Sequence, residues 1–332
     1  MNFNIDEIFN IKNDEHFNEL SIKIFQYQYK NNLVYQQFVD YLFQHSKKNI
    51  ESIKHYTQIP FLPIEFFKSH TITCFEVHNQ TPYFESSGTT KQNLSRHYIY
   101  DEKIYQTSIL KGFELFYGNP KDYLFLFLLP EESERPYSSL IYMAKYLMSF
   151  SSFNESGFYL KKMNVLPELL NKYHNSNVKV FILGLSYALM DFAEMNIRLN
   201  DNVIVMETGG MKGKREELPK NIFYAYLKNK LGISKIHSEY GMTELFSQAY
   251  SKENGIFYTP LWMKVLVRET NDPLTLYEKN KQGIINVIDL ANFYTCSFIA
   301  TADLGKINSD GSFEILGRSD FSDIRGCNLM YQ

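Results

Sequence analysis

The chain has 332 residues, of which 44% are hydrophobic, so it is long enough to form one large or two medium-sized domains with packed interiors. Its 34 Lys and Arg residues nearly balance 37 Asp and Glu residues, which argues against a nucleic-acid surface. Cys74, Cys296 and Cys327 are widely spaced and form no CxxC pair, which argues against a disulfide framework or a zinc site. Since no leader opens the chain and the longest apolar run, 123–130, is too short for a membrane span, we expect a soluble cytoplasmic protein.

The first 75 residues combine two helical patterns with a proline-rich segment. Apolar residues recur at three- and four-residue spacing over 14–30 and again over 32–46, which predicts two amphipathic helices. Two prolines in segment 59–68 break any helix there and predict an extended, packed strap. Residues 70–75 alternate in the manner of a strand.

A hydroxyl-rich segment, Ser86-Ser87-Gly88-Thr89-Thr90-Lys91, follows an aromatic strand that begins at Tyr83. Loops of small hydroxylated residues expose backbone N–H groups and often wrap phosphates. The segment is not a Walker A loop, because no Gly-Lys-Ser/Thr opens a helix here, and an ordinary Ser/Thr turn is the alternative. Arg96 or His97 could reach the same phosphates; the alternatives are a solvated arginine and a satisfied surface histidine.

The middle of the chain alternates buried strands with helices. The expected helices are 104–116, 138–150, 165–173 and 187–194, and the expected strands are 122–129, 178–184 and a segment that ends in Thr208-Gly209-Gly210. This alternation predicts a largely parallel sheet covered on both faces, with ligands at the carboxyl ends of its strands. Residues 212–215 add positive charge at one such end, unless they form a solvated loop.

The chain is organised around a tight polar turn, Ser238-Glu239-Tyr240-Gly241-Met242-Thr243-Glu244, which we expect between a strand at 233–236 and a helix at 245–250. Its glycine, Gly241, lets the backbone approach a ligand closely, and its tyrosine provides a ring for stacking. The threonine hydroxyl and glutamate carboxylate at its end suit Mg²⁺ beside phosphate oxygens. A glycine turn with a glutamate helix cap is the alternative.

Beyond residue 258 the pattern changes to alternating residues. The segments 263–268, 283–290, 297–303 and 313–318 predict a small antiparallel sheet. We expect it to bring Asp303 and Arg318 onto loops, where the carboxylate can hold ribose hydroxyls and the guanidinium can hold a phosphate or a ribose. A β-turn aspartate and a surface ion pair are the alternatives.

The order of these motifs resembles the core motifs of adenylate-forming enzymes, which include acyl-CoA ligases and the adenylation domains of peptide synthetases. The resemblance rests on Ser-Ser-Gly-Thr-Thr-Lys at 86–91, Tyr-Gly-Met-Thr-Glu at 240–244, Thr-Ala-Asp-Leu-Gly at 301–305 and Gly-Arg-Ser-Asp at 317–320. The proline-rich strap, Thr-Gly-Gly-Met-Lys at 208–212 and Asp-Ile-Arg-Gly-Cys-Asn-Leu-Met at 323–330 are most similar to LuxE-type acyl-protein synthetases. The resemblance extends from about residue 60 to the end of the chain.

The resemblance implies an α/β fold with mostly parallel sheets flanked by helices and a small antiparallel β subdomain, as in the N-terminal domain of adenylate-forming enzymes. We expect a helical segment over 1–58, an adenylation core over 59–255 and a β-rich subdomain over 256–332. Because the hinge-like motif stands at 317–320, we expect the protein to lack the C-terminal lid of larger ligases, with its catalytic lysine, as the short LuxE-type proteins do. The phosphate loop also lacks the Gly and Pro that usually follow its threonine pair.

The resemblance further implies roles for individual residues. The β- and γ-phosphates of ATP would be handled by Ser86, Ser87, Gly88, Thr89, Thr90 and Lys91. The other roles would be an adenine-side loop at Gly209 and Gly210, adenine stacking by Tyr240 beside Gly241, an α-phosphate contact from Thr243, Mg²⁺ binding by Glu244, and ribose binding by Asp303 assisted by Arg318. Lys91, Lys212, Lys214 or Arg325 would have to replace the lid lysine.

The implied reaction is attack of a carboxylate on the α-phosphorus of ATP, which yields acyl-AMP and pyrophosphate with ATP and Mg²⁺ as cofactors. The Cys327 thiolate, favoured by Arg325, would then accept the acyl group and deliver it to a reductase or carrier-protein partner, unless Cys327 is a buried, idle cysteine. The 27 Phe and 25 Tyr residues are consistent with an apolar acid, unless they simply fill the core, and the resemblance implies a fatty acid. An acyl- or aryl-CoA ligase and a non-catalytic nucleotide-binding scaffold are the alternatives.

Overall fold

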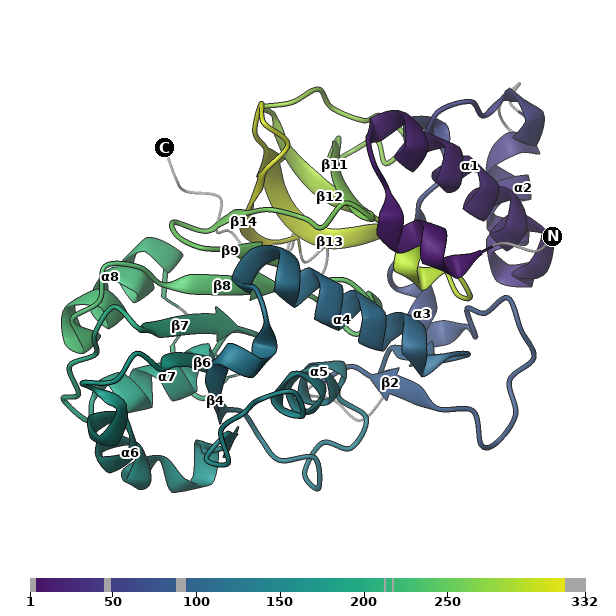
Figure 1. The fold of residues 1–332 in the computed structure, drawn as a ribbon. Coiled ribbons are helices and arrows are strands. Elements are labelled where there is room, and N and C mark those ends of the chain that lie inside the picture. Colours follow the sequence, from purple (N-terminus) through teal and green to yellow (C-terminus); the bar gives the residue numbers. More distant parts are fainter. Residues whose placement is uncertain (1–3, 45–48, 88–93, 212, 217, 320–332) are drawn as a thin grey trace.

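The computed structural model describes residues 4–44, 49–87, 94–211, 213–216 and 218–319. Its helices are α1 (Asp14–Asn31), α2 (Leu33–Gln44), α3 (Phe66–Ser69), α4 (Glu102–Tyr117), α5 (Ser139–Met148), α6 (Leu166–Tyr173), α7 (Ser186–Ala193) and α8 (Lys220–Leu231). Figure 1 shows a largely parallel sheet with its helices on one side of the molecule, and a second sheet with α1 and α2 on the other.

The mostly parallel sheet has the strand order β5-β4-β6-β7-β8-β9, in which only β9 is antiparallel to its neighbour. Its strands are β4 (Tyr123–Leu128), β5 (Gly157–Phe158), β6 (Lys179–Leu185), β7 (Val203–Thr208), β8 (His237–Tyr240) and β9 (Ala249–Ser251). The predicted alternation of strands and helices is therefore confirmed. All six residues of β4 are buried, as expected for a central parallel strand covered on both faces.

Helices cover both faces of this sheet. On one face, Phe113 of α4 contacts Phe125 of β4 and Phe181 of β6, with ring centroids 5.7 and 5.3 Å apart. On the other face, Gly184 makes room for α7, because a Cβ atom at this position would lie 3.0 Å from Leu189. Residues 181 and 184 point to opposite faces because side chains alternate along a strand. The core therefore lies in two layers on either side of the sheet.

The second sheet is antiparallel and has the order β10-β14-β13-β12-β11. Its strands are β10 (Ile256–Phe257), β11 (Met263–Arg268), β12 (Gln282–Asp289), β13 (Phe298–Ile307) and β14 (Phe313–Arg318). A further short strand, β1 (Leu62–Pro63), pairs in parallel with β13, and β2 (Tyr83–Glu85) and β3 (Arg96–Tyr98) form a separate hairpin. The predicted antiparallel subdomain is confirmed, whereas the division of the chain at residues 58 and 255 stays a prediction.

Helices α1 and α2 pack on the connection between β12 and β13. Gln28 donates hydrogen bonds of 3.0 Å to the carbonyls of Asn292 and Phe293, and Asn32 donates one of 3.0 Å to the carbonyl of Thr295. Tyr27 stacks on Phe293, with ring centroids 4.5 Å apart. These buried contacts attach the N-terminal helices to the antiparallel sheet, most of whose strands come last in the sequence.

Four local expectations are wrong. The strand expected at 233–236 lies at His237–Tyr240, so the first three residues of the expected polar turn, 238–240, belong to strand β8. The helix expected at 245–250 is absent among the described residues, where a turn leads into β9. Residues 70–75 form no strand, and the strap is extended only as far as β1 before the helical turn α3.

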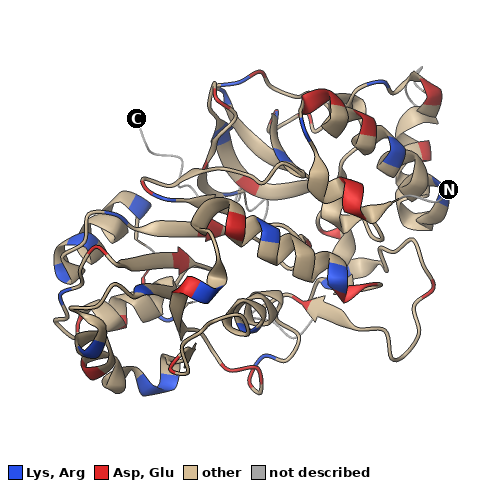
Figure 2. Cartoon of the chain, in the orientation of Figure 1, with Lys and Arg blue, Asp and Glu red and all other residues tan. Residues whose placement is uncertain are grey.

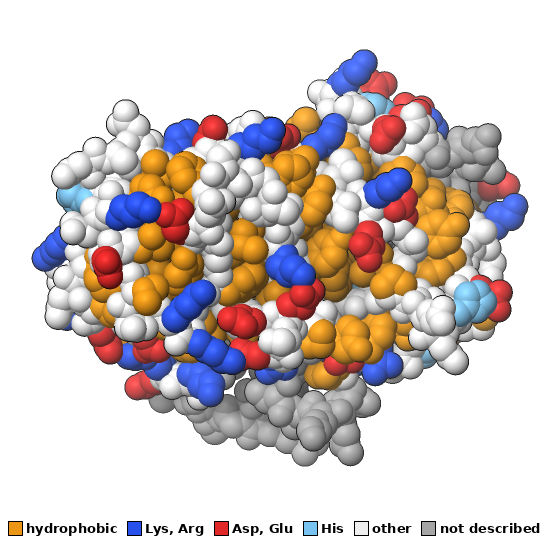
Figure 3. Space-filling view, turned by 60° about the horizontal axis from the view of Figure 1, so that its bottom comes forward, with side chains coloured by type: hydrophobic (Ala, Val, Ile, Leu, Met, Phe, Trp, Pro, Cys, Tyr) orange, Lys and Arg blue, Asp and Glu red, His pale blue; other side chains and the backbone are white. Residues whose placement is uncertain are grey.

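Two surface features follow from the sequence. Figure 2 shows Lys and Arg interspersed with Asp and Glu along the described elements, as the nearly equal numbers of the two charge types imply. On the face drawn in Figure 3, hydrophobic side chains lie in several groups that charged side chains interrupt. Within the described part of the chain, no helix is both long enough and apolar enough to cross a membrane.

Candidate active site

The candidate site lies where the carboxyl end of β8 meets β13 and β14, between the two sheets of Figure 1. Tyr240, the last residue of β8, donates a 2.8 Å hydrogen bond from its hydroxyl to Oδ2 of Asp303. Asp303 lies opposite Arg318 in the β13–β14 ladder. The structure therefore brings these three predicted residues together, although Asp303 and Arg318 stand in strands rather than on the expected loops.

Burial dominates the electrostatics of this group. It raises the pKa of Asp303, and the Tyr240 hydroxyl and the charges of Arg318 and Lys220 oppose that rise. The Lys220 ammonium also lies 5.4 Å from the centre of the Phe257 ring, next to Tyr240. An aspartate with two cations and a hydroxyl nearby stays ionised more readily, so it can accept hydrogen bonds from a ligand's hydroxyl groups.

The turn after β8 is held in place by a buried histidine. Nδ1 of His97 lies 2.9 Å from the carbonyl oxygen of Thr243, and Nε2 lies 2.9 Å from Oγ1 of Thr295. Burial lowers the pKa of His97 to about 4, so the ring is neutral at pH 7. Since a carbonyl oxygen can only accept, Nδ1 carries the proton and Nε2 accepts from Thr295. His97 is thus a positioning residue, and the expectation that it could reach a phosphate is wrong. The alternative of a satisfied histidine is right except for its place, because His97 is buried and not at the surface.

A second buried anchor is Asp289, at the end of β12. Its carboxylate accepts hydrogen bonds from the backbone N–H of Phe246 at 2.9 Å and of Ser247 at 2.8 Å. It also accepts from the Ser247 hydroxyl at 2.6 Å and from the N–H of Ala291 at 3.1 Å. The segment that follows the polar turn is thereby fixed to the antiparallel sheet without being helical.

Glu244 is the residue that could bind a divalent cation. Its side chain is 6% exposed, and burial raises the pKa of its carboxyl, whereas Arg318 and Lys68 lower it. The Ser95 hydroxyl is close enough to lower that pKa as well, yet its oxygen is buried without a well-formed hydrogen bond. A buried carboxylate beside an unsatisfied hydroxyl fits Mg²⁺, which takes oxygen ligands and commonly shares one or two carboxylates with substrate phosphates.

The first residue of the predicted phosphate loop, Ser86, lies beside Ser95, a neighbour of Glu244. The N–H of Ser86 donates to the Ser95 carbonyl at 3.1 Å, and the N–H of Ser95 donates to the Ser86 hydroxyl at 3.0 Å. Ser87 follows and is exposed. The rest of the loop falls outside the described residues: Gly88, Thr89, Thr90 and Lys91. Ser86 and Ser95, which flank that part of the chain, are bonded to each other beside the Glu244 carboxylate.

The turn after β7 adopts a conformation that favours glycine. Gly209 and Gly210 both have φ of 70°, in the left-handed region. The preceding Thr208 donates a 2.5 Å hydrogen bond to Oε2 of Glu239, and burial and the charge of Glu207 raise the pKa of Glu239 to about 7. This bond ties the carboxyl ends of β7 and β8 together.

The Glu239 carboxyl group also explains why residue 241 is a glycine. A Cβ atom at Gly241 would lie 2.3 Å from Oε1 of Glu239, closer than real Cβ contacts allow. The Glu239 side chain is held by its bond to Thr208, so it cannot move aside without losing that bond. A glycine is therefore needed here because of the Glu239 side chain, whereas the predicted close approach of a ligand to Gly241 stays a prediction.

Other candidate cations are engaged elsewhere. Arg96 pairs with Glu85 at 3.1 Å, and the Arg215 guanidinium pairs with Asp191 at 2.5 Å and with Glu194 at 3.0 Å. These pairings support the solvated-arginine alternative for Arg96. Lys214 is exposed, and Lys212 and Arg325 lie outside the described residues.

Two of the three cysteines, Cys74 and Cys296, lie within the described residues. Cys296 is fully buried, and burial raises the pKa of its thiol to about 12. Burial also raises the pKa of the Cys74 thiol. Neither is therefore a thiolate at neutral pH, which fits a structural role for Cys296. Cys327 lies outside the described residues, and its role stays a prediction.

The sequence reasoning missed three residues of the site: Lys68, Ser95 and Lys220. Lys68 stands at the end of the proline-rich strap, which was noted for packing and not for charge. Ser95 and Lys220 are single polar residues without a motif of their own. The nearness of Lys68 and Ser95 to Glu244 depends on contacts between segments more than 140 residues apart.

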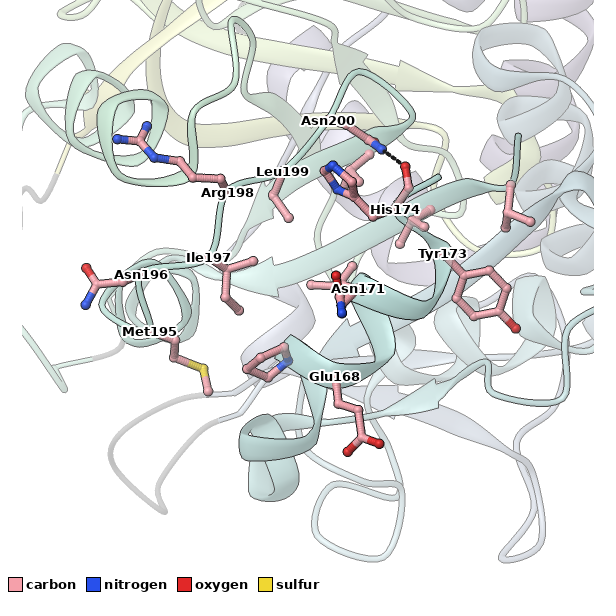
Figure 4. A pocket seen from close by; sticks show the side chains of 15 residues that line it. Glu168, Asn171, Tyr173, His174, Met195, Asn196, Ile197, Arg198, Leu199 and Asn200 are labelled. Atoms are coloured by element: carbon pink, nitrogen blue, oxygen red, sulfur yellow. Dashed lines mark hydrogen bonds between the residues drawn. The ribbon is translucent and has the colours of Figure 1, made fainter. Parts of the chain in front are cut away.

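A cavity of about 480 Å³ lies at the amino ends of the parallel strands, between α6 and residues 195–200. Figure 4 shows its lining, in which Asn200 donates a 2.7 Å hydrogen bond to the carbonyl of His174. The lining includes Val180 and Val203, which stand at the starts of β6 and β7. It is therefore separated from the candidate site by the length of the strands.

We expect His97→Gln to change how stability depends on pH. A group whose folded pKa is about 4, below the ordinary value of about 6.5, binds its proton more readily when unfolded, so its contribution to stability is lost as pH falls from 6.5 towards 4. That loss approaches about 1.4 kcal/mol per pH unit for one proton. Glutamine can keep both hydrogen bonds but does not titrate. Urea unfolding at several pH values should therefore show a shallower acid decline for the variant; parallel curves would contradict this account of His97.

Three solved structures are similar to the chain. 2-Hydroxyisobutyryl-CoA ligase, in an open conformation with 2-HIB-AMP and CoA, is 12% identical, with a TM-score of 0.66 over 93% of this chain and 70% of the ligase. ATP-bound MatB from Rhodopseudomonas palustris is 14% identical, with a TM-score of 0.52 over 71% of this chain and 47% of MatB. The ATP-bound RpMatB-BxBclM chimera B1 is 15% identical, with a TM-score of 0.54 over 71% of this chain and 47% of the chimera.

The likeness shows the fold: a mixed α/β architecture that matches the adenylate-forming domain, as the sequence motifs implied. The chain spans about half the length of the MatB structures. No protein-family model matches the sequence, and no curated protein matches it either.

Proposed function

We propose that the protein activates a carboxylic acid by adenylation. A carboxylate oxygen of the acid attacks the α-phosphorus of ATP, the bond from that phosphorus to the β-phosphate oxygen breaks, and acyl-AMP and pyrophosphate result. The observation that carries this proposal is the bond from Tyr240 to Asp303, opposite Arg318, at the carboxyl end of β8, four residues before Glu244. Tyr240, Asp303 and Glu244 suit a nucleotide's base, ribose and metal-bound phosphates, in that order.

Each of the described residues would have its own role in binding ATP. Asp303 accepts hydrogen bonds from the ribose hydroxyls, and Arg318, opposite it in β14, adds positive charge. Tyr240 is already bonded to Asp303 and presents its ring beside it. Thr243, whose carbonyl His97 holds, would contact the α-phosphate. Positioning and charge stabilisation are the main contributions that a protein makes to phosphoryl chemistry.

Mg²⁺ would be held by Glu244, with the phosphate oxygens as its other ligands. Bound there, it would neutralise charge on the phosphates, and it would also offset the cost of burying the carboxylate. Among the described residues there is no group of three or more His, Cys, Asp or Glu that could hold a metal by itself. The proposal therefore has metal and ATP bind together.

The second step of the proposal transfers the acyl group to a thiol. A thiolate attacks the carbonyl carbon of acyl-AMP, a thioester forms and AMP leaves. We propose Cys327 as that thiol, in the manner of LuxE-type acyl-protein synthetases, with a fatty acid as substrate and a reductase or carrier protein as the final acceptor. This step rests on the resemblance around Cys327, because that residue lies outside the described part of the chain.

An acyl-CoA ligase is the second candidate. It is favoured by the likeness over 93% of the chain to 2-hydroxyisobutyryl-CoA ligase, whose structure holds both 2-HIB-AMP and CoA. In that case the thiol of CoA takes the place of Cys327, and the adenylation step is unchanged.

The test follows oxygen from the acid to AMP. The intact protein is incubated with ATP, Mg²⁺ and a panel of fatty and aromatic acids labelled with oxygen-18 in the carboxylate, with and without CoA. Adenylation predicts that the AMP formed carries one labelled oxygen, because the carboxylate oxygen stays on phosphorus when the acyl group leaves. AMP without label, or no acid-dependent AMP at all, would contradict the proposal.

The same incubation identifies the acceptor when the acyl chain carries a radioactive label. Label retained on the denatured wild-type protein and absent from Cys327→Ser would establish the acyl-enzyme. Label found only on CoA would establish the ligase reading.

A further inference from the structure

Three cations surround the candidate site, and they are not equivalent. Arg318 stands opposite Asp303 in the β13–β14 ladder. The Lys220 ammonium lies 5.4 Å from the centre of the Phe257 ring, which packs against Tyr240, and the Tyr240 hydroxyl bonds Asp303. Lys220 and Arg318 therefore lie at the Asp303 end of the site. Lys68 stands at the Glu244 end, because it belongs to α3, which packs beside the turn that carries Glu244.

Lys68 is held at that end by the helix that carries it. Its neighbour Phe67 in α3 is buried and packs edge-on against His97, with ring centroids 5.7 Å apart and an interplanar angle of 73°. His97 in turn bonds the carbonyl of Thr243, the residue before Glu244. The backbone of Lys68 is thus tied to the polar turn through two buried contacts.

The strap is also fixed from the side of the antiparallel sheet. Strand β1 pairs with β13 at Leu62↔Ile299 and Pro63↔Ala300, and the N–H of Ile64 donates a 2.9 Å hydrogen bond to the Ala300 carbonyl. Strand β13 is the one that carries Asp303. Lys68 itself is exposed, so its ammonium can reach a ligand while its backbone stays in place.

A nucleotide whose ribose lies at Asp303 and whose phosphates share a metal with Glu244 extends its phosphate chain away from Lys220 and towards Lys68. We propose that Lys68 is a catalytic residue of this site, whose ammonium contacts the β- and γ-phosphates of ATP. The inference rests on the proposed function for the identity of the ligand. The charge on these phosphates increases as pyrophosphate leaves, and a fixed cation beside them stabilises that charge. A lysine serves well as a point charge for phosphates.

The experiment compares ATP with AMP, which lacks the two terminal phosphates. Binding of each nucleotide to the full chain is measured by isothermal titration calorimetry in the presence of Mg²⁺, for the wild type, Lys68→Ala and Lys68→Arg. Loss of one charge-assisted contact predicts about ten-fold weaker ATP binding by Lys68→Ala. AMP binding should not change, and Lys68→Arg should keep most of the preference for ATP.

Two further variants make the result specific. Lys220→Ala should weaken ATP and AMP about equally, because it acts at the ribose end. Lys23→Ala should affect neither nucleotide, because Lys23 pairs with Glu19 on the surface of α1. Equal weakening of ATP and AMP by Lys68→Ala, or no weakening, would overturn the inference.

The two proposals can fail separately. Selective loss of ATP binding by Lys68→Ala, without any transfer of oxygen-18 to AMP by the wild type, would keep this inference and reject adenylation. Oxygen transfer with equal weakening of ATP and AMP would do the opposite, and failure of the wild type to bind ATP would overturn both.

Discussion

Replacement of Glu244 by glutamine is expected to lower the rate of acid-dependent pyrophosphate release by about 100-fold or more, the typical effect of removing one preorganised electrostatic contact at a reacting phosphate or acyl group. The amide keeps the shape of the carboxyl but cannot hold Mg²⁺ with the same strength. The fold should not suffer, because burial raises the pKa of Glu244 and so already disfavours the charged form. We therefore expect an unchanged or higher melting temperature.

This opposition between activity and stability is the informative part of the measurement. Pyrophosphate release and thermal unfolding are measured on the same preparations, with Glu114→Gln as the matched control, since Glu114 is exposed on α4. The control should match the wild type in both. If Glu244→Gln lost stability together with activity, the carboxylate would be a structural group, and the proposed metal site would be wrong.

The second large effect is on stability. Asp289→Ala is expected to lower the free energy of unfolding by about 3 kcal/mol or more, because it removes the acceptor of four hydrogen bonds and leaves buried donors unsatisfied. Burial raises the pKa of Asp289 to about 6, above its ordinary value, so its contribution to stability decreases as pH rises from about 4 to 6. The variant should lack that dependence.

Urea unfolding at pH 7 measures this cost, with Asp272→Ala for comparison. Asp272 accepts hydrogen bonds in an exposed turn, where water can replace it as the acceptor, so its loss should cost much less than the loss of Asp289. A similar cost for the two variants would show that Asp289 does not anchor the segment after the polar turn.

The sequence predicted the fold where local pattern and tertiary environment agree. The apolar spacing of α1 follows from one buried helix face, and the continuous apolar run of β4 follows from burial on both faces. Strand β8 was misplaced because it reads His-Ser-Glu-Tyr, with polar side chains inside. Its Ser238 donates a 3.0 Å hydrogen bond to the buried carboxylate of Glu207, 31 residues earlier. No local pattern reveals such a partner.

In the candidate site, too, the residues that belong to local motifs were predicted and those that depend on long-range contacts were not. Tyr240, Asp303 and Glu244 were predicted because their motifs occur in a recognisable order, and the structure brings them together. The groups that hold them were not predicted. His97 follows Ser95 and Arg96 in a polar stretch, and Asp289 ends an apolar strand. Their partners lie 146 and 43 residues away in the chain. Their roles depend on which segments meet, which periodicity and composition do not specify.

Acid-dependent exchange of labelled pyrophosphate into ATP tests the central claim most directly, because it requires reversible formation of acyl-AMP and does not depend on the thiol acceptor. The measurement uses the full chain with Mg²⁺ and the panel of fatty and aromatic acids. We predict exchange that depends on one class of acid and is lost in Glu244→Gln. Binding of ATP without exchange for any acid would contradict adenylation and would favour a nucleotide-binding scaffold.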